Sequence, residues 1–218
     1  MPRVGFLFGA VTGAREVDFD AVVDAFEGCC DAAGVECVEG GGDAAGDGGG
    51  SSMAWCRVIA TAAALGRMFD SGCSVVHFSG HGDERGRIAL TTSAAGMDLL
   101  SPGDVGALLT GARARGAPPR TPALVVLAAC FSDAVAGAFV GLGVPHVVAV
   151  DRVAVSESAM VLFAREFYSA LLADGGDGRA VSVGEAFAAA VGSLTREAGG
   201  AACRCDKCGR SGAPACRH

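Results

Sequence analysis

The chain has 218 residues, of which 51% are hydrophobic, and a formal net charge of −7 at pH 7. This length suits one domain, or one domain with an appendage, and allows a sizeable buried core. The acidic balance argues against nucleic acid as a partner, and no apolar run reaches the roughly 18 to 20 residues of a membrane-spanning helix. The N-terminus also lacks the pattern of a signal peptide, so we expect a cytoplasmic protein.

Short apolar runs alternate along the chain with segments of helical periodicity. Strands are predicted at residues 4–8, 35–38, 73–78, 88–90, 124–127 and 147–150. Helices are predicted at residues 19–30, 55–69, 102–112, 134–142, 158–172 and 183–196. Asp18 or Asp20 is available to cap the first of these helices. Residues 40–52, GGGDAAGDGGGSS, predict a flexible glycine-rich loop.

Continuous apolar strands that alternate with amphipathic helices are typical of an α/β fold with a mostly parallel sheet covered on both faces. In such sheets the reactive site lies just beyond the carboxyl ends of the strands. Two stretches place reactive residues there, HFSGHG at 77–82 and VVLAACFSD at 125–133. If their strands are neighbours, His81 and Cys130 emerge at the same edge of the sheet.

The chemistry of this pair points to nucleophilic catalysis. The attacking form of cysteine is the thiolate, and the His81 imidazole can take the proton of Cys130. The helix expected after Cys130 would also favour the thiolate. Gly80 and Gly82 allow a sharp turn, with the N–H groups of Gly82 and Cys130 as donors to an oxyanion. The alternatives are an inert buried thiol at Cys130 and a turn-capping role for His81. His77 lies inside the strand, where we expect a packed, hydrogen-bonded histidine.

The stretches VVHFSGHGDERGRIAL (75–90) and PALVVLAACFSDAV (122–135) resemble the CHAT family, a branch of caspase-like and separase-like cysteine peptidases of clan CD. The likeness continues through residues 141–172 and 181–191. His81 also precedes Cys130 by nearly the spacing of about 50 residues found in caspases. The resemblance implies a caspase-like three-layer sandwich, with a central mostly parallel sheet and helices on both faces. It implies that His81 is the catalytic base and Cys130 the nucleophile.

The activity implied by this resemblance is that of a cysteine endopeptidase that cleaves protein or peptide substrates without a metal or organic cofactor. The alternative is a catalytically silent interaction or signalling module with the same fold. Because domains of this kind often need a partner to become active, an activating or regulatory protein is expected too. Asp151 follows the strand after the cysteine and could bind a basic substrate side chain, the alternative being a loop cap.

We expect one caspase-like domain over residues 1–197 and a cysteine-rich tail over residues 198–218. In the tail, Cys205 and Cys208 have the C-x-x-C spacing of a zinc site, and Cys216 with either Cys203 or His218 could complete four ligands. A second well-spaced pair is missing. We therefore expect a reduced, disordered tail with no bound metal and no role in catalysis.

Overall fold

A six-stranded parallel sheet forms the centre of the protein. The computed structural model describes residues 2–9, 18–39, 52–92, 96–113, 121–151, 155–173 and 179–200. The strands lie side by side in the order β2-β3-β1-β4-β8-β9, and every pair of neighbours is parallel. Their bounds are β1 Arg3–Phe8, β2 Glu36–Glu39, β3 Ser52–Ile59, β4 Val75–Ser79, β8 Leu124–Ala128 and β9 His146–Ala149.

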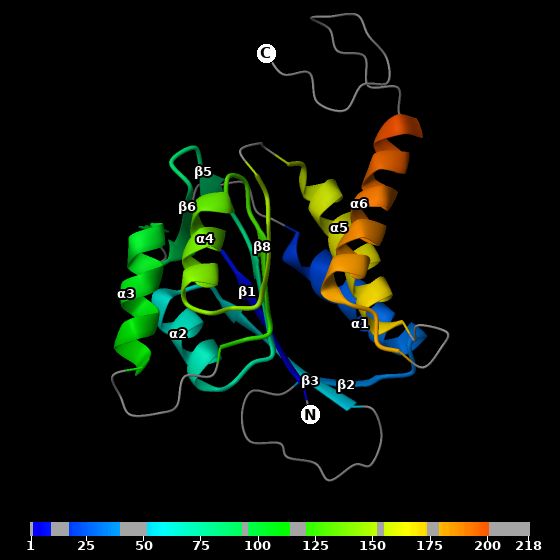
Figure 1. The fold of residues 1–218 in the computed structure, drawn as a ribbon, viewed down its shortest axis with the longest axis horizontal. Helices are drawn as coiled ribbons and strands as arrows, with labels where there is room; N and C mark the ends of the chain where they lie inside the picture. The colour runs from blue at the N-terminus through cyan, green and yellow to red at the C-terminus, as the bar shows by residue number, and fades with distance from the viewer. Residues whose placement is uncertain are drawn as a thin grey trace, which may run out of the picture.

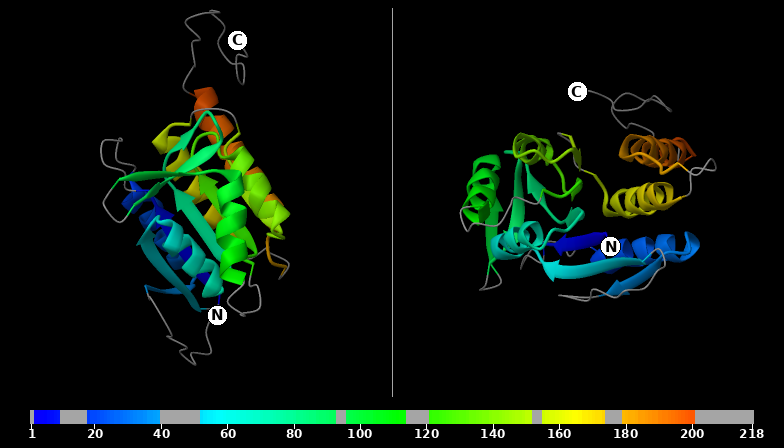
Figure 2. Two further views of the ribbon diagram at one scale, coloured as in Figure 1. Left: turned by 90° about the vertical axis from the view of Figure 1, so that its left-hand side faces the viewer. Right: turned by 60° about the horizontal axis from the view of Figure 1, so that its bottom comes forward.

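Helices cover both faces of this sheet (Figures 1 and 2). One face carries α2 (Ala62–Asp70), α3 (Pro102–Arg113) and α4 (Asp133–Gly141). The other face carries α1 (Phe19–Ala32), α5 (Glu157–Leu172) and α6 (Val183–Gly200). The predicted three-layer α/β sandwich is therefore confirmed. None of the described helices is both long and apolar enough to cross a membrane.

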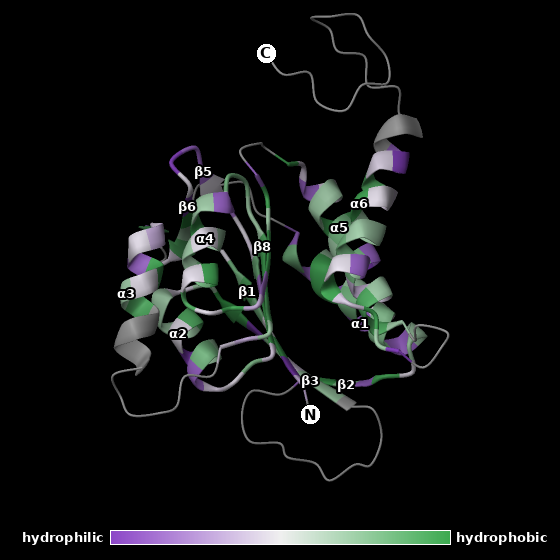
Figure 3. Cartoon of the chain, in the orientation of Figure 1, coloured by the Kyte–Doolittle hydropathy of each residue, from purple (hydrophilic) through white to green (hydrophobic). Residues whose placement is uncertain are grey.

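The core has two halves because successive side chains of a strand point to opposite faces of the sheet. Phe6 faces α1 and α5, and its ring lies 5.1 Å from that of Phe26 in α1. Leu7, the next residue, packs on the α2 side. Every residue of β8 is buried, so this strand is apolar on both faces, as parallel strands between two helical layers require. Figure 3 shows the hydrophobic strands between the two layers.

The prediction of a helix over residues 55–69 was wrong in its first part. Residues up to Ile59 form β3, which pairs with β1 on one side and β2 on the other. Trp55 packs in the core beside α1, and Cys56 packs on the opposite face of the sheet. The helix begins only after Thr61, whose Oγ accepts a hydrogen bond of 3.0 Å from the Ala64 N–H. Ser52 already belongs to β3, and the rest of the predicted glycine-rich loop lies outside the described residues.

A second, antiparallel sheet follows the carboxyl end of β4. It consists of β5 (Gly82–Asp83), β6 (Arg87–Thr91) and β7 (Met97–Leu100). Of this sheet, the sequence pattern predicted only an extended segment at 88–90, within β6. β5 is two residues long, and β7 is exposed over its first two residues and contains Asp98, so neither has the continuous apolar run that predicts a buried strand.

Candidate active site

The two reactive stretches end on neighbouring strands. β4 pairs directly with β8, and Ser79 at the end of β4 lies opposite Ala128 at the end of β8. The Gly80 N–H donates to the Ala128 carbonyl at 3.2 Å and extends this contact past the strand ends. His81 and Cys130 each follow two residues after their strand, so both emerge at the carboxyl edge of the sheet. The strands that carry His81 and Cys130 are therefore neighbours, as the sequence analysis assumed.

Backbone contact joins the two stretches beyond the sheet. A Cβ atom placed on Gly82 would lie 1.9 Å from the carbonyl oxygen of Cys130. Real Cβ atoms do not approach an oxygen this closely, so only glycine fits at position 82. His81 directly precedes Gly82 in the chain. His81 and Cys130 are both half-buried, so both remain partly accessible to solvent. The contact therefore places the histidine segment directly against the cysteine turn.

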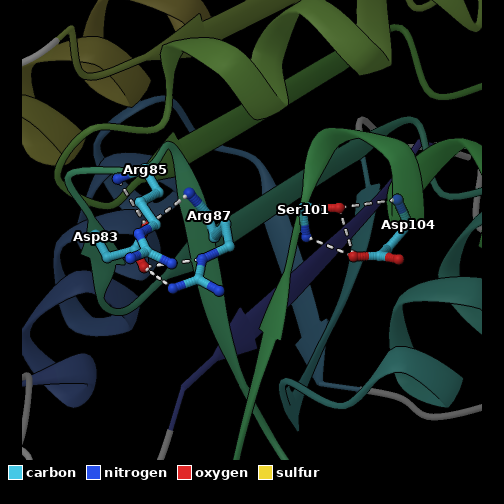
Figure 4. A network of polar contacts seen from close by, with 5 residues as sticks. All are labelled: Asp83, Arg85, Arg87, Ser101 and Asp104. Carbon is cyan, nitrogen blue, oxygen red and sulfur yellow. Dashed lines mark hydrogen bonds and ion pairs between the residues drawn. The ribbon is translucent and has the colours of Figure 1, made fainter.

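A tight hairpin after His81 holds this contact in place. Residues 84–86 connect β5 to β6, and Gly86 has a φ of 71°, as the last residue of a three-residue hairpin loop requires. The Asp83 carboxylate accepts hydrogen bonds from the N–H groups of Arg85 and Arg87, each 3.1 Å long, and from Arg87 Nε at 2.9 Å (Figure 4). The Arg87 guanidinium is the main reason that the pKa of Asp83 lies below its usual range.

The ladder of this hairpin determines the direction of the Gly82 N–H. The Ala89 N–H donates to the His81 carbonyl at 2.9 Å, so Gly82 and Ile88 form a non-hydrogen-bonded pair of the antiparallel ladder. In such a pair the N–H of each residue points away from the partner strand. The Gly82 N–H is therefore directed away from β6, on the strand edge that faces out of the hairpin.

The turn after Cys130 is strained and is held by a second loop. Phe131 has a φ of 55°, an unusual value for a bulky residue, and such backbone strain is found most often at functional sites. The Val155 N–H donates to Cys130 Sγ at 3.4 Å, and the Val155 carbonyl lies 3.8 Å from the same sulfur. Val155 therefore fixes the position of the Cys130 sulfur from a loop 25 residues further along the chain.

A comparison with protein families identifies the family of the chain. The family model of the CHAT domain matches residues 52–197, which is more than half of the chain. The chain belongs to the CHAT family. No curated protein matches the sequence. The CHAT match contains both His81 and Cys130, and it begins at β3. Because β1 lies between β3 and β4 in the sheet, the folded unit extends beyond the matched segment.

Ser132 is a residue of this CHAT domain whose role the sequence did not reveal. Its side chain is fully buried, and Oγ donates to the Leu127 carbonyl at 3.2 Å and accepts from the Val150 N–H at 3.1 Å. The hydroxyl thus ties the cysteine turn back to β8 and across to the end of β9. It precedes α4 but makes no capping bond to that helix. A small polar residue two positions after a strand-end cysteine is the only local signal for this role.

We expect Ser132→Ala to lower the free energy of unfolding by about 1–3 kcal/mol, because it removes both hydrogen bonds of a fully buried hydroxyl. It should also slow alkylation of Cys130, since the turn loses its tie to β9. Urea unfolding and alkylation kinetics measure the two effects. Ser169→Ala is the control, because Ser169 is exposed on α5 and its loss should change stability by less than about 0.5 kcal/mol. Equal behaviour of the two variants would contradict this role of Ser132.

His77 is packed and hydrogen-bonded, as predicted. It is fully buried in β4, and its Nδ1 lies 2.9 Å from the hydroxyl of Tyr168 in α5. No described residue forms a hydrogen bond with its Nε2. Burial lowers the pKa of His77 to about 3, so the ring is neutral at pH 7. His77 faces the α5 layer of the core and supports β4 from within.

Asp151 and the cysteine-rich tail are the other candidate sites that the sequence indicated. Asp151 follows β9 and is exposed, and its role in binding a basic substrate side chain stays a prediction. The tail cysteines and His218 lie outside the described residues. Within the described ranges, no group of three or more metal-binding side chains is placed to hold a metal ion.

Proposed function

We propose that this CHAT domain is a cysteine endopeptidase that uses a dyad of His81 and Cys130. The observation that carries the proposal is the contact between Gly82 and the Cys130 carbonyl, because it brings the histidine segment against the cysteine turn. The strained Phe131 and the Val155 N–H directed at sulfur support the same conclusion. The family relationship supports peptidase chemistry independently of this geometry.

In this mechanism the Cys130 thiolate attacks the carbonyl carbon of the scissile peptide bond. His81 takes the thiol proton and then donates it to the leaving amine, which forms an acyl-enzyme that water hydrolyses. The N–H groups of Gly82 and Cys130 bind the oxyanion, and the direction of the Gly82 N–H away from β6 supports its part in this. The chemistry requires no metal or organic cofactor.

Alkylation by iodoacetamide tests the dyad. We expect Cys130 to react faster than the other thiols of the folded protein, because an adjacent imidazole supplies the thiolate. The His81→Ala substitution should slow alkylation at Cys130, and Cys130→Ala should abolish the fast phase. His146→Ala is the matched control, since His146 is exposed at the start of β9, at the opposite edge of the sheet. Peptide mapping by mass spectrometry identifies the modified thiol.

The outcome that contradicts the proposal is equal alkylation of Cys130 in the wild type and in His81→Ala. Cys130 would then be an ordinary accessible thiol that does not depend on the histidine. In that case the domain is better described as a catalytically silent interaction or signalling module.

A further inference from the structure

An apolar cavity lies beside the cysteine turn, between the sheet and the helices of one face. Its volume is about 180 Å³. The lining consists only of Ala, Val, Leu, Met and Phe side chains, contributed by the ends of β8 and β9, by Val155 and by α5 and α6. Two lining residues on α6, Phe187 and Val191, are 41% and 39% exposed. Large apolar side chains left this open to water are typical of a binding site.

Val155 connects this cavity to the proposed nucleophile. Its main-chain N–H and carbonyl contact Cys130 Sγ at 3.4 and 3.8 Å, and the residue also lines the cavity. Ala128, two residues before Cys130, and Val150, whose N–H is bound by Ser132, line it too. The Cys130 sulfur and the apolar cavity are therefore both in contact with Val155.

We propose that this cavity binds a large apolar side chain of the substrate, such as Leu, Met or Phe. The proposal rests on the peptidase function proposed above. The side chain belongs to the residue that supplies the scissile carbonyl, because that side chain is the one nearest to Sγ when the carbonyl is attacked. A dry apolar cavity of about 150 Å³ accommodates a benzene molecule, so 180 Å³ suits a side chain of this size.

The lining disfavours a basic side chain in the same place. A Lys or Arg side chain in the cavity would find no charged or hydrogen-bonding side chain among the lining residues, and an unpaired buried charge is strongly unfavourable. Asp151, the residue predicted to bind a basic side chain, is exposed and is not part of the lining. The two hypotheses therefore predict opposite substrate preferences.

Inactivation by acetyl-Ala-Ala-X acyloxymethyl ketones tests the preference directly, with X as Leu, Met, Phe, Ala or Lys. We expect the second-order rate constant for Leu to exceed that for Ala by about 1,000-fold, since Leu has three more side-chain carbon atoms and each buried methylene contributes about 10-fold or more to discrimination. The Ala159→Phe substitution places a ring on a lining residue of α5. It should remove the advantage of Leu, so that the ratio of the rate constants for X = Leu and X = Ala falls to about one.

Ala189→Phe is the matched control, because Ala189 is exposed on α6 and is not a lining residue. This variant should keep the wild-type preference. A preference for Lys that disappears in Asp151→Ala would overturn the inference and leave the peptidase function intact. So would a preference unchanged by Ala159→Phe, in which case the cavity is free for an apolar segment of a partner. Absence of His81-dependent labelling by any of the reagents would overturn the peptidase function and this inference together.

Discussion

Replacing Gly82 by alanine is expected to lower the free energy of unfolding by about 3 kcal/mol or more and to abolish fast alkylation of Cys130. The added Cβ would lie 1.9 Å from the Cys130 carbonyl oxygen and 3.1 Å from its carbonyl carbon. Both are backbone atoms, so no side-chain rotation can relieve the clash. Overpacking of this kind costs about 1–3 kcal/mol, and more where the backbone must move. The backbone that must move here carries the proposed nucleophile.

Gly137→Ala is the matched control for this substitution. Gly137 lies within α4, and a Cβ added there would meet nothing within 4 Å. Alanine in a helix interior should therefore raise the free energy of unfolding by about 0.5–1 kcal/mol. Urea unfolding of both variants, with alkylation kinetics at Cys130, separates the steric effect from a general effect of removing glycine. A Gly82→Ala protein with wild-type stability and reactivity would contradict the contact between the two stretches.

The second large effect is a loss of stability in mild acid that originates at His77. Burial lowers the pKa of His77 to about 3 in the folded protein, whereas an exposed histidine has a pKa of about 6.5. The unfolded chain therefore binds this proton more readily. Buried, neutral His77 makes its full contribution to the free energy of unfolding above pH 6.5. As the pH falls from 6.5 toward 3, the free energy of unfolding decreases by up to about 1.4 kcal/mol per pH unit, because the unfolded chain takes up the proton and the folded chain does not. At pH 4.5 the loss is about 2–3 kcal/mol.

His77→Gln distinguishes this contribution from that of the carboxylates. Glutamine keeps a polar group opposite the Tyr168 hydroxyl but does not titrate. We expect the variant to be less stable than the wild type at pH 7 and the difference to shrink as the pH falls to 4.5. His146→Gln is the control, because His146 is exposed. Guanidinium unfolding at several pH values gives the comparison, and a wild-type–His77→Gln difference that stays constant between pH 7 and 4.5 would exclude His77 as the source.

Local sequence determined the main elements of the fold. β8 is an uninterrupted apolar run and β1 and β4 are largely apolar, and such runs predict strands buried between two layers. The start of α1 was also predictable, because capping depends on neighbouring residues alone, whereas the start of α2 was not. Asp18 accepts a hydrogen bond from the Ala21 N–H at 3.1 Å and so caps α1, a choice that the sequence left open between Asp18 and Asp20. The resemblance of two short stretches was enough to indicate the CHAT family.

Tertiary structure alone decided what depends on residues far apart in the chain. The run from Trp55 to Ile59 fits helical and extended spacing alike, and its pairing with β1 and β2 makes it a strand. Val155 reaches Cys130 from a position 25 residues away, and no local pattern indicates that contact. The hairpin after His81 contains a recognisable turn sequence, but its contact with the Cys130 carbonyl depends on β4 and β8 being neighbours. Local periodicity reports which side chains are buried. The packing of the whole chain determines which of them meet.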